Sequence, residues 1–298
     1  MLERSHRKNV IRPCLQDRVL LRVNEILMFV FAVIIAYPLL FVVFSSFEGQ
    51  VSTLTLNIFP KKWSIEGYKA VFEYRWIWVG YRNSLLYTLL GTLIGLAFCV
   101  LAAYPLSQPN LDGRGFFMGL FVFTMYFGGG MVPYYMVLKS LGMLNNFIVF
   151  IFPNLVSVYN MILVKNYIEG MPAEIFESAK IDGANDLTVF FKMVIPLSKP
   201  IIMTIALFVA ITHWNSWFDA YLFTNAQSLK TMQSILVEIL NQYQTSSANQ
   251  AANQASQTIT PDSIRMAATM IATIPIIMVY PFIQKYFVKG IMLGSVKS

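Results

Sequence analysis

Apolar stretches alternate with shorter polar connections along most of the chain. A helix needs about 20 mostly apolar residues to cross the hydrocarbon core of a bilayer. Six stretches meet this requirement, so the pattern predicts an all-α protein that is integral to a membrane. We place the six transmembrane helices at residues 25–44, 84–106, 116–138, 146–167, 200–223 and 267–287.

Composition and charge agree with a membrane environment. Hydrophobic residues form 56% of the 298 residues and charged residues only 12%, whereas soluble domains carry about 25% charged residues. The net charge of +7 does not indicate nucleic-acid binding, because the basic residues lie between apolar runs rather than among exposed aromatic residues.

The positive-inside rule orients the chain. Segment 1–24 is rich in arginine and is expected to stay in the cytoplasm as a polar N-terminal segment. An even number of spans returns the C-terminus to the same side. Four basic residues in the first outer connection oppose this trend, namely Lys61, Lys62, Lys69 and Arg75.

Two connections on the outer side carry recognisable patterns. In the extracellular loop, 225–265, apolar residues recur at helical spacing from Leu229 to Tyr243 and predict an amphipathic helix. A polar, low-complexity stretch follows, which we expect to be mobile. The first outer connection, 47–81, is rich in aromatic residues that suit the interface between membrane and water.

The cytoplasmic loop 169–199 has the features of a short helix that ends in a sharp turn. Pro172 suits a first helical turn, and the carboxylates of Glu174 and Glu177 favour the positive N-terminal end of a helix. Gly183 can adopt the left-handed conformation that commonly ends a helix.

A second short helix is predicted directly after this glycine. Asn185 or Asp186 can cap its start, and Pro196 closes it before the fifth span. We expect the resulting helix–turn–helix to lie along the membrane surface, where the small side chains of Ala179 and Ala184 would let a partner approach closely. An ordinary polar linker is the alternative.

Glu177-Ser178-Ala179, then Gly183, then nine residues and Met193-Val194-Ile195-Pro196 form a recognisable pattern. It resembles the EAA loop of ABC-importer permeases, which reads E-A-A, three residues, G, nine residues and I-x-L-P. In that family the loop forms coupling helices that dock into a groove of the nucleotide-binding subunit. The ATPase-coupling residues that the resemblance implies are Glu174, Glu177, Ser178, Ala179, Asp182, Gly183, Ala184 and Pro196, with Gly290, Gly294 and Lys297 in the C-terminal tail.

Segments elsewhere resemble carbohydrate permeases of the MalG-like (carbohydrate uptake type 1) family. They are Asn83-Ser84, Ala102-Ala103-Tyr104, Gly113-Arg114 and the run from Gly128 to Asn146. Val158–Asn160 and His213–Phe223 are similar to the LplC and YtcP type, which includes importers of alginate-derived oligosaccharides. The resemblance implies the type I ABC-importer permease fold over residues 25–298, in a bacterial plasma membrane, with both termini cytoplasmic.

The resemblance also implies partners. They are a second, homologous permease subunit, an ATPase dimer that carries ATP and Mg²⁺, a solute-binding protein outside the membrane, and an oligosaccharide substrate. The chain itself contains no GK dipeptide and hence no Walker A phosphate loop. We therefore expect it to bind no cofactor or metal and to have no catalytic residues of its own.

Two rival classes remain open. A secondary transporter driven by an ion gradient would show inverted repeats and charged relays within its spans. A membrane enzyme would need a clustered acid–base pair or a metal site at the membrane face.

The fifth span carries the best candidates for a sugar path. Trp214, Trp217 and Tyr221 recur on one face of a helix, with Asn215 and Asp219 on the adjacent face. Aromatic rings beside amide and carboxylate acceptors suit the apolar faces and hydroxyl edges of sugars, and an ionisable residue within a span usually faces a cavity or a partner. An interfacial aromatic belt is the alternative.

Other path candidates have equally good structural explanations. Tyr126 and Tyr135 lie on either side of Gly128–Gly130, a break at which we expect a kink or hinge; they could line the path or simply pack. Asn160 could face the path or form a hydrogen bond between helices.

Three further features favour packing over chemistry. Gly91 and Gly95 form a GxxxG pattern typical of close helix packing. His213 has no second histidine or cysteine near it in the sequence, and Cys99 lies within an apolar run without a metal-ligand pattern.

Overall fold

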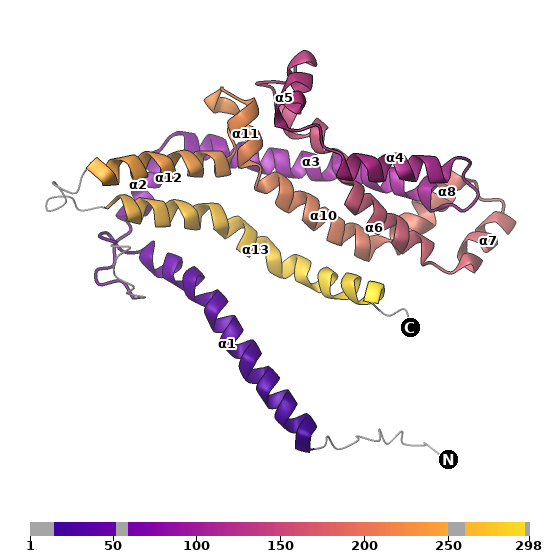
Figure 1. Cartoon of the computed structure of the whole chain (residues 1–298), viewed down its shortest axis with the longest axis horizontal. Coiled ribbons are helices and arrows are strands. Elements are labelled where there is room, and N and C mark those ends of the chain that lie inside the picture. The colour runs from indigo at the N-terminus through magenta and orange to yellow at the C-terminus, as the bar shows by residue number, and fades with distance from the viewer. Residues whose placement is uncertain (1–14, 52–58, 250–259, 296–298) are drawn as a thin grey trace.

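The chain is an elongated bundle of helices (Figure 1). The computed structural model describes residues 15–51, 59–249 and 260–295, and within these it describes the helix without side chains at 15, 243–249, 280 and 282–295. In these residues the only extended pairing is an isolated antiparallel bridge between Glu48 and Trp63. The expected all-α fold is confirmed.

Three helices are long and apolar enough to cross a membrane by themselves, namely α1 (Leu15–Ser45), α3 (Trp76–Ser107) and α13 (Pro261–Ser295). Three bent helix pairs also qualify, so the described residues hold between three and six candidate spans. The bends measure 113° between α4 (Arg114–Tyr126) and α5 (Met131–Ser140), 45° between 147–154 and α6 (Val158–Glu169), and 77° between 186–197 and α10 (Lys199–Trp214).

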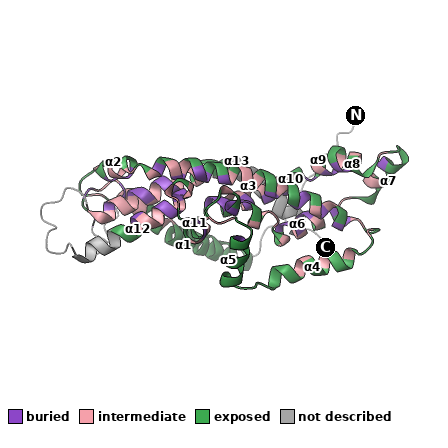
Figure 2. Cartoon of the chain, turned by 90° about the horizontal axis from the view of Figure 1, so that it is seen from above, coloured by how far each residue is buried: buried purple, intermediate pink, exposed green. Residues whose placement is uncertain are grey.

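The third expected span, 116–138, is not one helix. It breaks at Gly128–Gly130, where Gly130 has a φ of +85°, a conformation that glycine adopts at little cost. The prediction of a kink at these glycines is confirmed, and the bend is large enough to turn α5 away from α4 (Figure 2).

The fourth and fifth expected spans, 146–167 and 200–223, are also interrupted. The fourth begins with two 3-10 turns, η1 (Phe147–Phe150) and η2 (Phe152–Asn154), because a proline inside this stretch removes a helical N–H donor. The fifth ends at the close of α10 and resumes as a separate short helix, α11 (Trp217–Phe223).

The core of the bundle lies between α3, α6 and α10. Cys99 on α3 and Met161 on α6 belong to this cluster, and Cys99 is a free, buried thiol. A Cβ atom on Gly91 would lie 2.5 Å from the imidazole of His213, and one on Gly95 would lie 3.2 Å from a backbone oxygen. The predicted use of this GxxxG pattern in close helix packing is confirmed.

A second cluster forms a layer at one end of the bundle. It joins α2 (Glu66–Glu73), the first turns of α3 and α13, and α12 (Met232–Asn249), which follows the 3-10 turn η4 (Gln227–Leu229). The apolar face of α12 is buried, as the amphipathic pattern predicts. The polar stretch expected to be mobile is helical as far as Asn249, and the rest of it falls outside the described residues.

α1 stands apart from the bundle for most of its length (Figure 1). Its side chains are exposed from Gln16 to Ile35, and it is attached at its C-terminal end. There Ser46 Oγ and the hydroxyl of Tyr68 share a hydrogen bond of 2.7 Å, and Ser263 Oγ donates to the backbone oxygen of Gly49 at 2.6 Å.

Candidate coupling segment and solute path

The segment between α6 and α10 begins with α7 (Ala173–Ile181), which ends as its glycine predicts. Gly183 has a φ of +75°, and its N–H donates to the Lys180 oxygen at 3.0 Å. The N–H of Ala184 donates to the Ala179 oxygen at 2.9 Å. These two bonds form the Schellman arrangement that terminates many helices.

The second half of the segment is one curved helix of three parts, α8 (Asp186–Val189), the π-helical η3 (Phe190–Val194) and α9 (Ile195–Leu197). Asn185 caps it, because its side-chain oxygen accepts the Thr188 N–H at 2.8 Å. The helix ends one residue after Pro196 rather than at it. This proline lies in the first turn of α9, where its missing N–H costs little.

The side chains on the outer face of this segment are open to a partner. Ala179 is an exception, because it is only 4% exposed and packs into the chain's own core. We expected the small side chain of Ala179 to let a partner approach closely, and this expectation is corrected. Core residues of the chain itself fill the space beside Ala179. The exposed residues among those predicted for coupling are Glu174, Glu177, Ser178, Asp182, Gly183 and Pro196, while Ala184 is half-buried.

Large apolar side chains also point outward from this segment. Ile181 is 86% exposed, Leu187 67% and Phe191 60%. Apolar side chains on a protruding polar hairpin are a typical anchor for a protein groove. Of the C-terminal candidates, Gly290 and Gly294 lie in the part of α13 described without side chains, and Lys297 lies outside the described residues.

The aromatic residues of the fifth span do not share one face. Trp214 ends α10 and is 6% exposed, with its ring 6.4 Å from that of Tyr81. Trp217 and Tyr221 are 41% and 70% exposed on α11. The prediction that Trp214 shares one helical face with Trp217 and Tyr221 is wrong. The helix breaks at Asn215 and Ser216, and α11 begins as a separate helix at Trp217.

α11 instead brings Asp219 to the aromatic residues of α5. The half-buried Asp219 lies within electrostatic range of Tyr134. The rings of Tyr134 and Tyr135 lie 5.7 and 6.2 Å from that of Phe223. Asp219 and these two tyrosines therefore gather at one place.

The remaining path candidates differ in exposure. Tyr126, at the end of α4, is 80% exposed, and Asn215 is exposed beside the helix break. Asn160 is 7% exposed in the first turn of α6. Of these three, Tyr126 and Asn215 have the more open side chains.

A set of buried polar ties on α3 was not predicted as a site. The amide nitrogen of Asn83 donates to the backbone oxygens of Ser228 and Lys230 at 2.7 and 3.0 Å. Tyr87 donates to the Leu229 oxygen at 3.0 Å. These hydrogen bonds hold the turn before α12. The signal in the sequence was the amide of Asn83 near the start of an apolar helix, because a buried amide needs hydrogen-bond partners.

Lys230 itself is partly buried in this turn and pairs with Glu238 of α12. Burial lowers the pKa of the Lys230 ammonium. His213, a buried polar residue of α10, forms a hydrogen bond with the backbone of Phe150 and packs on Gly91 of α3. Both residues serve the packing of helices.

The bent apolar helices of this bundle suit a protein embedded in a membrane. The family model "Binding-protein-dependent transport system inner membrane component" matches residues 12–293. The chain belongs to this family, whose members are transporter subunits of the inner membrane.

Two bacterial proteins are similar to the chain over most of its length. It is 38% identical over 270 residues to the polygalacturonan/rhamnogalacturonan transport system permease protein YtcP of Bacillus subtilis (strain 168), covering 90% of this chain and 94% of that protein. It is also 38% identical over 266 residues to the protein LplC of the same organism, covering 88% and 89%. The expected similarity to the LplC and YtcP type is confirmed.

A solved structure of an ABC transporter also contains a chain that is similar to this one. One chain in the crystal structure of a bacterial ABC transporter involved in the import of the acidic polysaccharide alginate superposes with a TM-score of 0.82. It is 30% identical, and the match covers 93% of this chain and 99% of that one. A chain in a second alginate transporter structure, 13% identical with a TM-score of 0.59, shares the fold.

Proposed function

We propose that the chain is the permease through which an ABC importer moves oligosaccharides inward across the bacterial plasma membrane. The observation that carries this proposal is the 38% identity, over nine-tenths of the chain, to a permease of polygalacturonan/rhamnogalacturonan transport. The alginate importer with a TM-score of 0.82 supports complex or acidic oligosaccharides as the substrate class. Lys61 and Lys62 on the first outer connection suit a substrate of negative charge.

In this proposal the membrane is crossed six times and both termini are cytoplasmic. Three single helices and three bent pairs supply the spans. The permease domain covers 25–298 after the cytoplasmic segment 1–24. Loop 169–199 then faces the cytoplasm, and loop 225–265 faces outward.

A separate ATPase dimer, which binds ATP and Mg²⁺, provides the energy by moving the α7–α8 hairpin. The exposed carboxylates of Glu174 and Glu177 and the outward-facing Ile181 and Leu187 support docking of a protein there. Gly290, Gly294 and Lys297 would approach the ATPase dimer from the C-terminal tail. Transport then follows from alternating access, in which the nucleotide state favours one of two bundle conformations.

A second permease subunit completes the transporter. The exposed apolar length of α1 supports this partner, because a helix that does not pack on its own bundle can pack on another. A solute-binding protein would deliver the sugar to the outer end, where α2 and α12 form a folded layer.

For the sugar path, the α5–α11 contact is the best-supported place. Trp217 and Tyr221 offer exposed rings, and Asp219 offers a carboxylate that can accept hydrogen bonds from sugar hydroxyls. Tyr126, Tyr135 and Asn215 border this region in the proposal, and Trp214 and Asn160 support it from within the bundle.

The test is reconstitution of the complete transporter in proteoliposomes. We expect oligosaccharides of alginate or polygalacturonan, presented with the binding protein, to stimulate ATP hydrolysis and to accumulate inside. Uptake driven by an ion gradient without the ATPase would instead identify a secondary transporter and overturn the proposal.

Gly183→Pro tests the coupling role of the hairpin. Proline cannot adopt a φ of +75° and lacks the N–H that bonds to Lys180, so the turn between α7 and α8 must rearrange. We expect assembly to survive and sugar-stimulated ATP hydrolysis to be lost.

The matched control is Gly142→Pro. Gly142 ends α5 with a φ of +65°, and its N–H donates to Lys139 at 3.1 Å, so the local damage is the same. We expect this variant to retain stimulation. Normal transport and hydrolysis in Gly183→Pro would show that the hairpin does not couple.

A further inference from the structure

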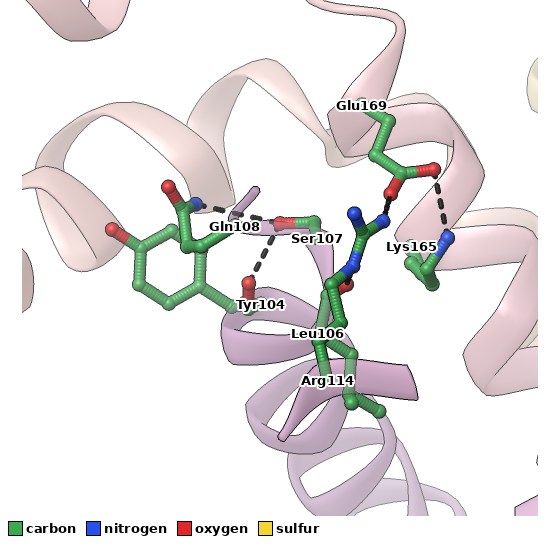
Figure 3. A network of polar contacts seen from close by, with 7 residues as sticks. All are labelled: Tyr104, Leu106, Ser107, Gln108, Arg114, Lys165 and Glu169. Carbon is green, nitrogen blue, oxygen red and sulfur yellow. Dashed lines mark hydrogen bonds and ion pairs between the residues drawn. The ribbon is translucent and has the colours of Figure 1, made fainter. Parts of the chain in front are cut away.

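A group of charged side chains ties α4 to the last turn of α6 (Figure 3). The guanidinium of Arg114, the first residue of α4, pairs with one carboxylate oxygen of Glu169. The ammonium of Lys165 donates to the other oxygen at 2.8 Å. Arg114 Nε also donates to the backbone oxygen of Leu106, near the end of α3, at 2.8 Å. One arginine therefore joins three helices.

The group lies directly before the α7–α8 hairpin, which runs from the start of α7 at Ala173 to the end of α9 at Leu197. Glu169 is the last residue of α6, and α7 begins only four residues later, at Ala173. A displacement of α7 would act on the end of α6 through this short connection. Glu169 lies at that end, where its ion pair with Arg114 opposes movement relative to the bundle.

The end of α3 also contacts the other side of the hairpin. The Tyr104 hydroxyl lies 3.5 Å from the backbone oxygen of Asp186, and its ring lies 5.0 Å from that of Phe190. The Tyr167 hydroxyl donates to the Leu197 oxygen at 3.3 Å, which closes the base of the hairpin between α6 and α9. The hairpin is thus held at both of its ends against one corner of the bundle.

The ionic group is better shielded than an ordinary surface pair. The exposed fractions of the side chains are 33% for Arg114, 30% for Glu169 and 12% for Lys165. Exposed ion pairs contribute little because solvent screens them and their side chains lose entropy. Here two different nitrogens of one arginine side chain bind groups on two helices, α3 and α6, a geometry that lysine cannot reproduce.

We propose that Arg114 is a positioning residue for energy coupling, which fixes the end of α6 to the α3–α4 corner so that movement of α7 is transmitted to the bundle. This inference rests on the proposed function. Arg114 touches neither sugar nor nucleotide in this role. It acts through Glu169, and its loss should separate hydrolysis from transport rather than reduce both together.

Arg114→Gln is the decisive variant. It removes the tie to α6 but leaves Glu169 paired with Lys165, so no carboxylate is left unpaired and the chain should fold and assemble. In proteoliposomes with the partner permease, ATPase and binding protein, the measured quantity is the amount of alginate or polygalacturonan oligosaccharide imported per ATP hydrolysed. We expect this ratio to fall by about 3- to 10-fold, with hydrolysis itself within about 2-fold of the unaltered protein.

Arg265→Gln provides the matched control. Arg265 pairs with Asp262 at 3.1 Å, with exposed fractions of 27% and 22%, at the start of α13 at the opposite end of the bundle. We expect its import-to-hydrolysis ratio to stay unchanged. A fall in this control as large as that in Arg114→Gln would overturn the proposal.

The outcomes separate this inference from the function on which it rests. If the unaltered transporter shows no sugar-stimulated hydrolysis, the proposed function fails. If it does and Arg114→Gln keeps the same ratio, or loses import and hydrolysis in proportion, the positioning role is wrong. If Arg114→Gln fails to assemble, Arg114→Lys decides: an intermediate ratio supports the role, and a full ratio overturns it.

Discussion

α1 and α3 are nearly equal in length, with 31 and 32 residues, and both are apolar enough to span a membrane, yet they pack in opposite ways. α3 buries residues along its whole course and contacts α6, α10, α12 and α4. α1 is exposed over most of its length and touches the bundle mainly at its end.

The difference lies in small and polar residues rather than in apolar character. α3 carries glycine at positions 80, 91 and 95, and each lies within 3.2 Å, measured from an added Cβ, of an atom on another segment. α1 contains no glycine. Within lipid the hydrophobic effect does not drive helices together, so close approach and buried hydrogen bonds must do so. Four substitutions test this explanation.

Filling the α3 surface at Gly91 should cause the largest loss of stability. A leucine there would overlap the His213 ring, which is 2% exposed and cannot move aside. We expect Gly91→Leu to cost about 3 kcal/mol or more, measured as a lower apparent Tm of the purified chain in mild detergent. Gly91→Ala should also lower the apparent Tm, and adding His213→Ala should restore it, because the smaller side chain leaves room for the new methyl group. If the double variant stays as unstable as Gly91→Ala, the strain does not come from the contact with His213.

Asn83→Ala should rank second. The variant removes the donor that the backbone oxygens of Ser228 and Lys230 share, and the lost amide of Asn83 is only 4% exposed. We expect a cost of about 1–3 kcal/mol in the same assay. The control is Asn166→Ala, at an exposed position of α6, which should be close to neutral. Equal effects would mean that the turn before α12 is held by other contacts.

Some of these features were predictable from the sequence. The caps of the α7–α8 hairpin depend on local backbone chemistry, so Gly183 was identified correctly as the turn. Of the two cap candidates, Asn185 and Asp186, the structure uses Asn185. The GxxxG pattern correctly indicated a close contact. The hairpin residues resemble the EAA loop of ABC-importer permeases, and this resemblance predicted the family that the match over residues 12–293 confirms.

Other features depend on contacts between distant segments and were missed. Helical periodicity continues across Asn215, so Trp214 and Trp217 were expected on one face, although the helix breaks between them. Ala179 was assigned to a partner because its small size does not tell which neighbour fills the space. Arg114 and Glu169 are 55 residues apart, and nothing in the local sequence pairs them.

Tyr87→Phe should have a smaller effect than either α3 substitution above. The ring stays stacked on Phe150 at 4.1 Å, and only the hydrogen bond from the hydroxyl to the Leu229 oxygen is lost. We expect a cost of about 1 kcal/mol, the usual net value of one hydrogen bond. A loss as large as that of Asn83→Ala would show that this hydroxyl carries the turn by itself.

Ala32→Leu on α1 should have almost no effect on the chain by itself. The side chain is exposed, so the larger residue meets no atom of the bundle. We expect the free energy of unfolding to change by less than about 0.5 kcal/mol, and the apparent Tm to change correspondingly little. If a second permease packs on this face, the same substitution should reduce its recovery in co-purification, because small residues permit close helix approach. Val30→Phe, about 200° around the helix, enlarges nearly the opposite face and should leave recovery unchanged. A lower apparent Tm for Ala32→Leu in the isolated chain would mean that α1 packs on its own bundle, and the contrast with α3 would then fail.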